Sequence, residues 1–69
     1  MSYYEKLNKI HNFIGIEKTI RALCNHVGIS ITTYYKTKYL HIGEHGFLSI
    51  GVRCAINGAL DKIVNQQAY

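Results

Sequence analysis

The chain has 69 residues, with eight Lys and Arg against four Asp and Glu, which gives a net charge of +4. A chain of this length supports one domain with a thin core, so we expect a single domain over residues 1–69 and no enzyme active site beside a binding surface. The longest apolar region, residues 47–64, is interrupted by Arg53, Asp61 and Lys62, which excludes a membrane span. With two cysteines and no visible signal segment, we expect a cytoplasmic protein with reduced thiols.

The first predicted helix begins at Ser2, which has Glu5 three residues later in the pattern of a capping box. Gly15 is predicted to end it, because helices often end at a residue in the left-handed region. Apolar residues recur between these limits at helical spacing. They are Tyr3, Leu7, Ile10 and Ile14.

The second predicted helix covers residues 16–26 and ends at Gly28. Its apolar stripe consists of Ile16, Ile20, Leu23, Cys24 and Val27. Ser30 is the predicted N-cap of a short third helix, from Ile31 to about Leu40, because serine side chains accept from the first free N–H groups. This third helix directs Tyr34 inward.

Residues 31–54 also allow a β-hairpin. Residues 31–39 are rich in β-forming types, and apolar and small or polar residues alternate after a turn at residues 43–46. That alternative is an α+β fold with a hairpin at about residues 31–54. The regular helical spacing elsewhere favours an all-α domain of four helices.

The fourth predicted helix, residues 47–65, is apolar over much of its circumference. One stripe holds Leu48, Val52, Ala55, Ala59 and Ile63, and it is widened by Phe47, Ile50, Cys54, Ile56, Leu60 and Val64. Such a helix must be covered on more than one side. We therefore expect a homodimer in which a second helix approaches the small side chains of this one. The predicted interface residues are Gly51, Val52, Ala55, Gly58, Ala59 and Ile63.

The spacing around Gly28 is typical of two helices packed around a tight turn. Glycine suits the turn because its backbone tolerates positive φ. Ser30 caps the second helix, and Tyr34, six residues after the glycine, packs that helix onto the first. The remaining positions hold small or apolar residues, namely Leu23, Cys24, Val27 and Ile29.

The run from Gly28 to Lys36 resembles the turn and recognition helix of the helix-turn-helix superfamily. It is similar to small phage regulators, to repressors with a G-V/I-S-x-x-T turn and to transposase DNA-binding segments. The resemblance covers about twenty residues. Two residues depart from the usual pattern: Cys24 stands where alanine or glycine is common, and Tyr34 is larger than the common aliphatic residue.

The resemblance implies a transcriptional regulator that binds double-stranded DNA as a dimer, with the second helix in the major groove. The implied base contacts are Ile31, Thr32, Tyr35 and Lys36. The implied phosphate contacts are Lys18, Thr19, Arg21, Ser30, Lys38 and Tyr39. The charge distribution agrees, since residues 17–39 hold four of the basic residues and one acid.

Three alternatives remain open at the sequence level. Within DNA binding, the chain could be an excisionase-like recombination accessory. In another class, a small inhibitor or adaptor would use its tyrosines to bind a protein. A zinc site could be assembled from Cys24, His26, His41, His45 and Cys54, but the cysteines lack knuckle spacing, so we expect no metal and no cofactor.

Overall fold

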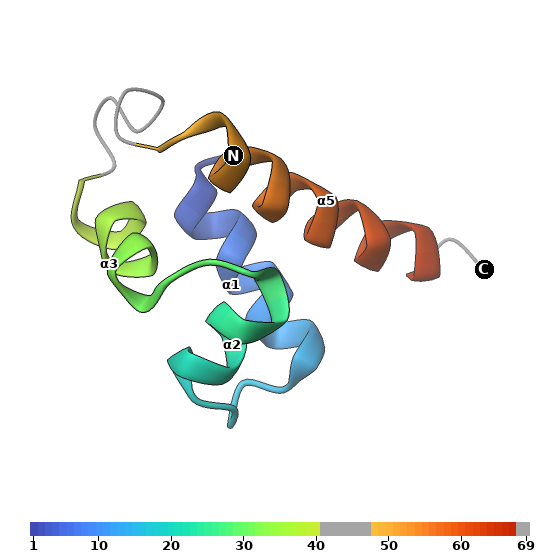
Figure 1. Cartoon of the computed structure of the whole chain (residues 1–69). Coiled ribbons are helices and arrows are strands. Elements are labelled where there is room, and N and C mark those ends of the chain that lie inside the picture. The colour runs from blue at the N-terminus through green and yellow to red at the C-terminus, as the bar shows by residue number, and fades with distance from the viewer. Residues whose placement is uncertain (41–47, 68–69) are drawn as a thin grey trace.

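The computed structural model describes residues 1–40 and 48–67, which form four helices (Figure 1). They are α1 (Tyr3–Ile14), α2 (Ile20–Val27), α3 (Ile31–Tyr39) and α5 (Ile50–Gln67). No strand occurs in these ranges, so the expectation of an all-α domain is confirmed. The predicted turn at residues 43–46 lies outside the described residues.

Helix α1 begins and ends where its sequence predicts. The Ser2 Oγ accepts a hydrogen bond from the Glu5 N–H at 3.1 Å. Gly15, with φ 120°, ends the helix, and its N–H donates to the His11 carbonyl. Tyr3, Leu7 and Ile10 are buried, so the apolar stripe faces the core as expected.

Helix α2 is shorter than the predicted residues 16–26. It begins after Thr19, whose Oγ1 accepts from the Ala22 N–H at 3.0 Å. Residues 15–18 form a turn instead, closed by a 2.9 Å bond from the Lys18 N–H to the Gly15 carbonyl. Ile16 therefore lies outside the helix and is 74% exposed, and its assignment to the apolar stripe is wrong. A threonine cap fixes the helix start more firmly than one preceding apolar residue does.

Residues 31–39 are helical, so the β-hairpin alternative is wrong for this segment. The Ser30 Oγ accepts from the Thr33 N–H at 3.1 Å and starts the helix. Tyr34 and Thr37 are buried, with 4% and 0% of their surface exposed. The cap and this buried pair outweigh the β-propensity of the segment, which depends strongly on context. Leu40, predicted near the helix end, follows it and is 43% exposed.

Helix α5 begins three residues later than predicted and extends two residues further, to Gln67. Its buried stripe is also narrower than the sequence indicated. Ile56 and Ile63 are buried, whereas Ile50 and Val64 are 72% and 55% exposed and Cys54 is exposed. The prediction that these three exposed residues lie on a covered face is therefore wrong for a single protomer.

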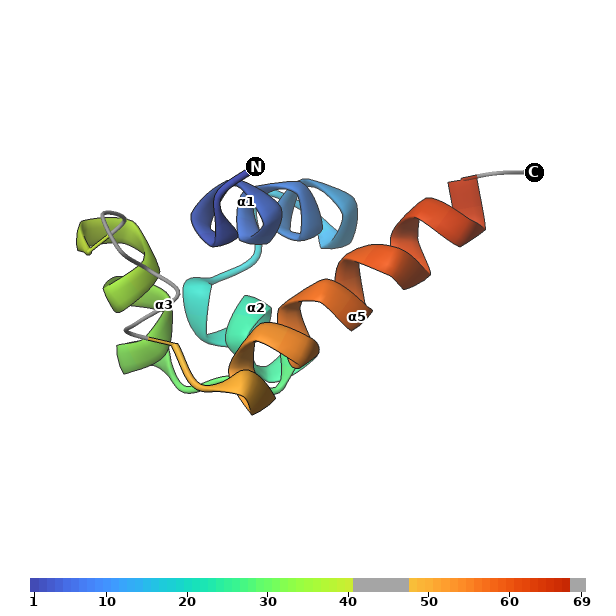
Figure 2. The same cartoon turned by 90° about the horizontal axis from the view of Figure 1, so that it is seen from above.

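Helix α1 lies at the centre of the fold and packs against the other three helices. Figures 1 and 2 show α1, α2 and α3 grouped together, with α5 crossing them and its C-terminal end projecting beyond. The core combines residues of all four helices and of the segment before α5. Its buried members are Tyr3, Leu7, Ile10, Leu23, Cys24, Val27, Tyr34, Leu48, Ile56 and Ile63. None of the helices in the described ranges has both the length and the apolar character to cross a bilayer.

Candidate nucleic-acid interface

The turn between α2 and α3 is set by Gly28. Its φ of 90° and ψ of 34° lie in the left-handed region, and its N–H donates to the Cys24 carbonyl. The Ile29 N–H donates to the same carbonyl at 3.0 Å. No heavy atom lies within 4 Å of the position where a Cβ would stand. Backbone conformation, and not space, therefore selects glycine here.

The side chains predicted to pack α2 against α3 are buried as the spacing requires. Leu23, Cys24 and Val27 are 0%, 3% and 8% exposed. Burial raises the pKa of the Cys24 thiol, so this cysteine is a protonated core residue. Ile29 is partly buried against the same cluster. Residues 20–39 thus form a helix, a three-residue turn and a second helix held by one continuous apolar contact.

The large Tyr34 side chain is accommodated because it reaches α1 as well as α2. Its ring lies 6.0 Å from the Tyr4 ring, at a 60° interplanar angle. The sequence pattern missed Tyr4, because nothing in the spacing of residues 1–14 indicates that it faces α3.

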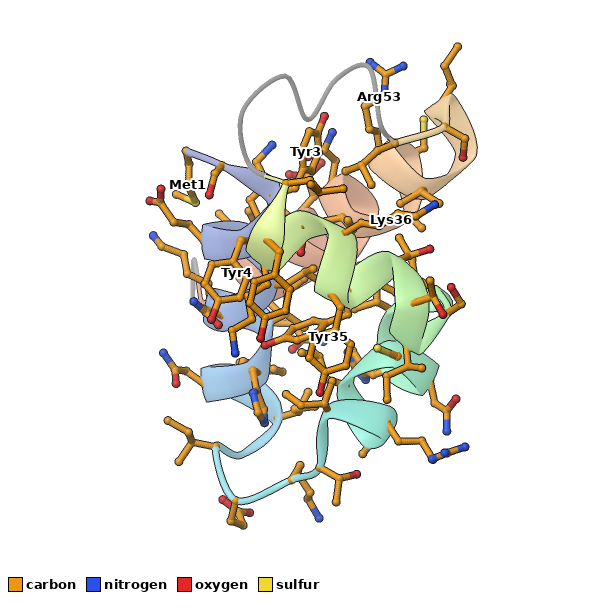
Figure 3. The ribbon with its side chains drawn as sticks, turned by 90° about the vertical axis from the view of Figure 1, so that its left-hand side faces the viewer. Met1, Tyr3, Tyr4, Tyr35, Lys36 and Arg53 are labelled. Atoms are coloured by element: carbon orange, nitrogen blue, oxygen red, sulfur yellow. The ribbon has the colours of Figure 1, made fainter. Side chains whose placement is uncertain are left out.

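The four predicted base-contact residues, Ile31, Thr32, Tyr35 and Lys36, are all exposed on α3. Tyr34 and Thr37 on the opposite side are buried. Figure 3 looks onto this helix and shows Tyr35 on the side toward Tyr4, with Lys36 on the other side. The structure therefore brings the predicted base contacts together on one outward surface.

A row of tyrosine rings fixes one flank of this surface. The Tyr35 ring meets the Tyr34 ring edge-on, with centroids 5.2 Å apart. On its other side it lies nearly parallel to the Tyr39 ring, with centroids 6.1 Å apart and an angle of 11°. Such contacts restrict the rings without covering them. The spacing of four residues between Tyr35 and Tyr39 is the sequence signal for this pair.

The predicted phosphate contacts surround this helix pair and are all exposed. They are Lys18, Thr19, Arg21, Ser30, Lys38 and Tyr39. The oxygens of Thr19 and Ser30 already cap α2 and α3. The Lys38 ammonium lies 5.4 Å from the centroid of the Tyr39 ring. Helices α2 and α3 contain no acidic residue, so nothing on them opposes a polyanion.

The chain matches no protein-family model, no curated protein and no solved structure. Function must therefore be argued from the residues and geometry of the chain itself.

The predicted dimer residues on α5 differ in how far they are exposed. Gly51 and Gly58 are exposed, and Val52, Ala55 and Ala59 are half-buried. Ile63 is only 5% exposed and packs into the core of its own protomer, so it has little surface left for a partner. Ala55, Gly58 and Ala59 line an open hollow of about 400 Å³, which Phe13 and Val27 help to form.

The described residues contain no group of three potential metal ligands close together. Cys24 is buried in the core, whereas His26 and Cys54 both line the hollow beside α5. His41 and His45 lie outside the described residues.

Proposed function

We propose that this protein is a transcriptional regulator that binds double-stranded DNA by placing α3 in the major groove. The observation that carries the proposal is the tight turn at Gly28, after which a capped helix presents Thr32, Tyr35 and Lys36 outward. The major groove is about 12 Å wide and admits one α-helix. A helix held on a packed partner presents its side chains to base edges in fixed register.

The charges near α3 support the same proposal. Lys36 is placed to donate to a guanine edge or an adjacent phosphate, because lysine acts as a point charge. Lys18 and Arg21 stand at the beginning of α2, while Lys38 and Tyr39 end α3. Cations at both ends of the helix pair would contact phosphates and fix the register, without reading sequence themselves.

We propose further that the regulator is a homodimer that uses the small residues of α5. Gly58 and the neighbouring alanines leave a hollow that a second helix or an apolar side chain can enter. Phe13, which lines the same hollow and is 44% exposed, adds apolar surface there. A dimer would place two copies of α3 on half-sites about 34 Å apart on one side of the duplex.

Binding to a random-sequence duplex over a range of salt concentrations tests the proposal. We expect binding near micromolar affinity at low salt that weakens steeply as salt rises, because each neutralised phosphate releases counterions. The Lys36→Ala variant should lower the affinity while keeping the wild-type helical circular dichroism. Val27→Asp, which places a charge in the core, should lose the helical signal as well.

A matched control keeps the charge count equal. Lys9→Ala removes a cation from an exposed position of α1, outside the proposed DNA and dimer surfaces, and should leave the affinity close to wild type. No binding to any duplex at low salt would refute the proposal. Capture of a defined protein instead would favour the adaptor alternative.

Sedimentation over a range of protein concentrations tests the dimer. Gly58→Glu adds a large charged side chain where no atom lies within 4 Å, so the protomer should still fold. We expect this variant to sediment as a monomer at concentrations where the wild type is dimeric. A wild-type monomer at all concentrations would refute the α5 interface and leave the single-helix DNA contact to be tested separately.

A further inference from the structure

Lysine is the only residue type on α3 that reads purine bases through paired hydrogen bonds. Arg or Lys makes such contacts to guanine, and Asn or Gln makes them to adenine. Residues 31–39 contain no Arg, Asn or Gln, and their two lysines are Lys36 and Lys38. The beginning of the helix instead presents the Ile31 side chain, 39% exposed, the exposed Thr32 and the Tyr35 ring, 41% exposed.

Three hydroxyl groups of this segment form hydrogen bonds within it. The Ser30 and Thr33 hydroxyls bond to each other at 2.8 Å, and the Ser30 Oγ also accepts from the Thr33 N–H. The Thr37 hydroxyl donates to the Tyr34 carbonyl at 2.7 Å in the core. These bonds stabilise α3. The outward side chains at the beginning of the helix are those of Ile31, Thr32 and Tyr35, which offer an aliphatic chain, a methyl group beside a hydroxyl, and an aromatic ring.

The two cations of α3 lie in its last turn. The Lys38 ammonium packs over the Tyr39 ring in the last turn. Lys36 projects to the side of the helix opposite Tyr4 (Figure 3). Tyr35 is held by its neighbours Tyr34 and Tyr39, so its ring is positioned before any ligand binds. Little side-chain entropy is therefore lost when this ring is covered.

In the major groove, thymine is the base that offers an apolar group, its 5-methyl. We propose that Ile31, the Thr32 methyl and the Tyr35 ring recognise thymine 5-methyl groups in A·T-containing sites. This inference rests on the proposed DNA binding and names the base chemistry that the same surface reads.

Duplexes that differ only in this methyl group provide the test. A random duplex pool is enriched on the wild-type protein, and the enriched sequences are then copied with deoxyuridine in place of thymidine. We expect the uracil copies to bind roughly four-fold more weakly for each contacted methyl, since burial of one such group is worth about 0.8 kcal/mol. Equal affinity for the thymine and uracil copies would overturn the inference.

Two variants separate methyl recognition from altered DNA shape. Thr32→Ser keeps the hydroxyl and removes only the methyl, and Ile31→Ala shortens the exposed aliphatic chain. Both should reduce the preference for thymine over uracil, with wild-type circular dichroism as the folding check. Lys36→Ala is the matched control, because it should weaken binding to both duplexes while leaving that preference unchanged.

The outcomes distinguish the two proposals. A pool that yields no binding sequence refutes DNA binding and, with it, methyl recognition. If the pool yields binding sequences, but Thr32→Ser and Ile31→Ala leave the preference for thymine over uracil unchanged, methyl recognition alone is refuted.

Discussion

Gly28 and Gly58 both have open space where a Cβ would stand, because no heavy atom lies within 4 Å of that position at either residue. They differ in backbone conformation. Gly28 has φ 90° at the end of α2, whereas Gly58 lies within α5. The same substitution at the two sites therefore isolates the backbone contribution to stability.

We predict opposite effects of alanine at these two glycines. Gly28→Ala should lower the free energy of unfolding by about 1–2 kcal/mol, the cost of a left-handed residue with a side chain. Gly58→Ala should raise it by about 0.5–1 kcal/mol, because alanine is the better helix former. Urea unfolding of both variants at equal protein concentration measures the difference. A free energy of unfolding that Gly28→Ala leaves unchanged or raises would show that Gly28 is not constrained by its backbone.

The Tyr34 hydroxyl has a pKa well above its ordinary value. Burial raises the pKa of its hydroxyl from 10.0 to about 12, and the adjacent Tyr4 hydroxyl adds to the shift. The folded protein therefore holds this proton at a pH where the unfolded chain has released it. The contribution of Tyr34 to stability is present in full below pH 10.0 and is lost as the pH rises toward about 12.

We accordingly predict that Tyr34→Phe flattens the alkaline loss of stability. The measurement is the free energy of unfolding in urea from neutral pH upward. Tyr39→Phe, at a position 66% exposed, is the control and should retain the wild-type slope. If the two variants show equal slopes, Tyr34 is not the residue that links stability to pH.

At the scale of whole helices, the four helices in the described residues all begin in the same way. A hydroxyl side chain precedes each helix and accepts from the N–H three residues later. The acceptors are Ser2, Thr19, Ser30 and Ser49. Such caps satisfy one of the N–H groups that a helix leaves unpaired. Where a cap and an apolar stripe disagree, as they do for α2, the cap decides the boundary.

The cap of α3 allows helix stability to be separated from DNA binding. Ser30→Ala should lower the free energy of unfolding by about 1 kcal/mol, the usual value of an N-cap. Ser30→Asp should restore that stability, because aspartate is an equally good cap, yet weaken DNA binding through its negative charge. Thermal unfolding and duplex titration measure the two effects. Tight duplex binding by Ser30→Asp would place Ser30 away from the DNA.

At the scale of the whole molecule, α5 completes a core that α1–α3 share. Ile56 is fully buried. The Lys6 ammonium donates to the Asn57 Oδ1 at 2.6 Å and lies 4.6 Å from the Tyr3 ring centroid, which ties α5 to α1. With only 69 residues, the domain has a thin core, so each such contact contributes a large share of its stability.

We predict a large loss of stability when a buried side chain of α5 is truncated. Ile56→Ala should lower the free energy of unfolding by about 2–5 kcal/mol, which combines lost burial with a cavity. Ile50→Ala, the same change in the same helix at a side chain 72% exposed, should alter it by less than about 0.5 kcal/mol. Equal losses at the two positions would mean that α5 does not pack on α1 as described.

The sequence alone determined the features that depend on neighbouring residues. The caps at Ser2 and Ser30, the turn at Gly28 and the inward direction of Tyr34 follow from spacing, because the interacting groups lie within a few residues of one another. The sequence also favoured a helix over residues 31–39, although the β-propensity of these residues left a β-hairpin as an alternative.

Only the tertiary structure decided which apolar residues are covered. Ile16, Ile50 and Val64 share a periodicity with buried residues yet lie exposed, because the neighbouring helices do not extend over them. The contact of Tyr4 with Tyr34 likewise depends on how α1 crosses α3. Burial is set by the arrangement of several helices, whereas a cap or a turn is set within one short segment.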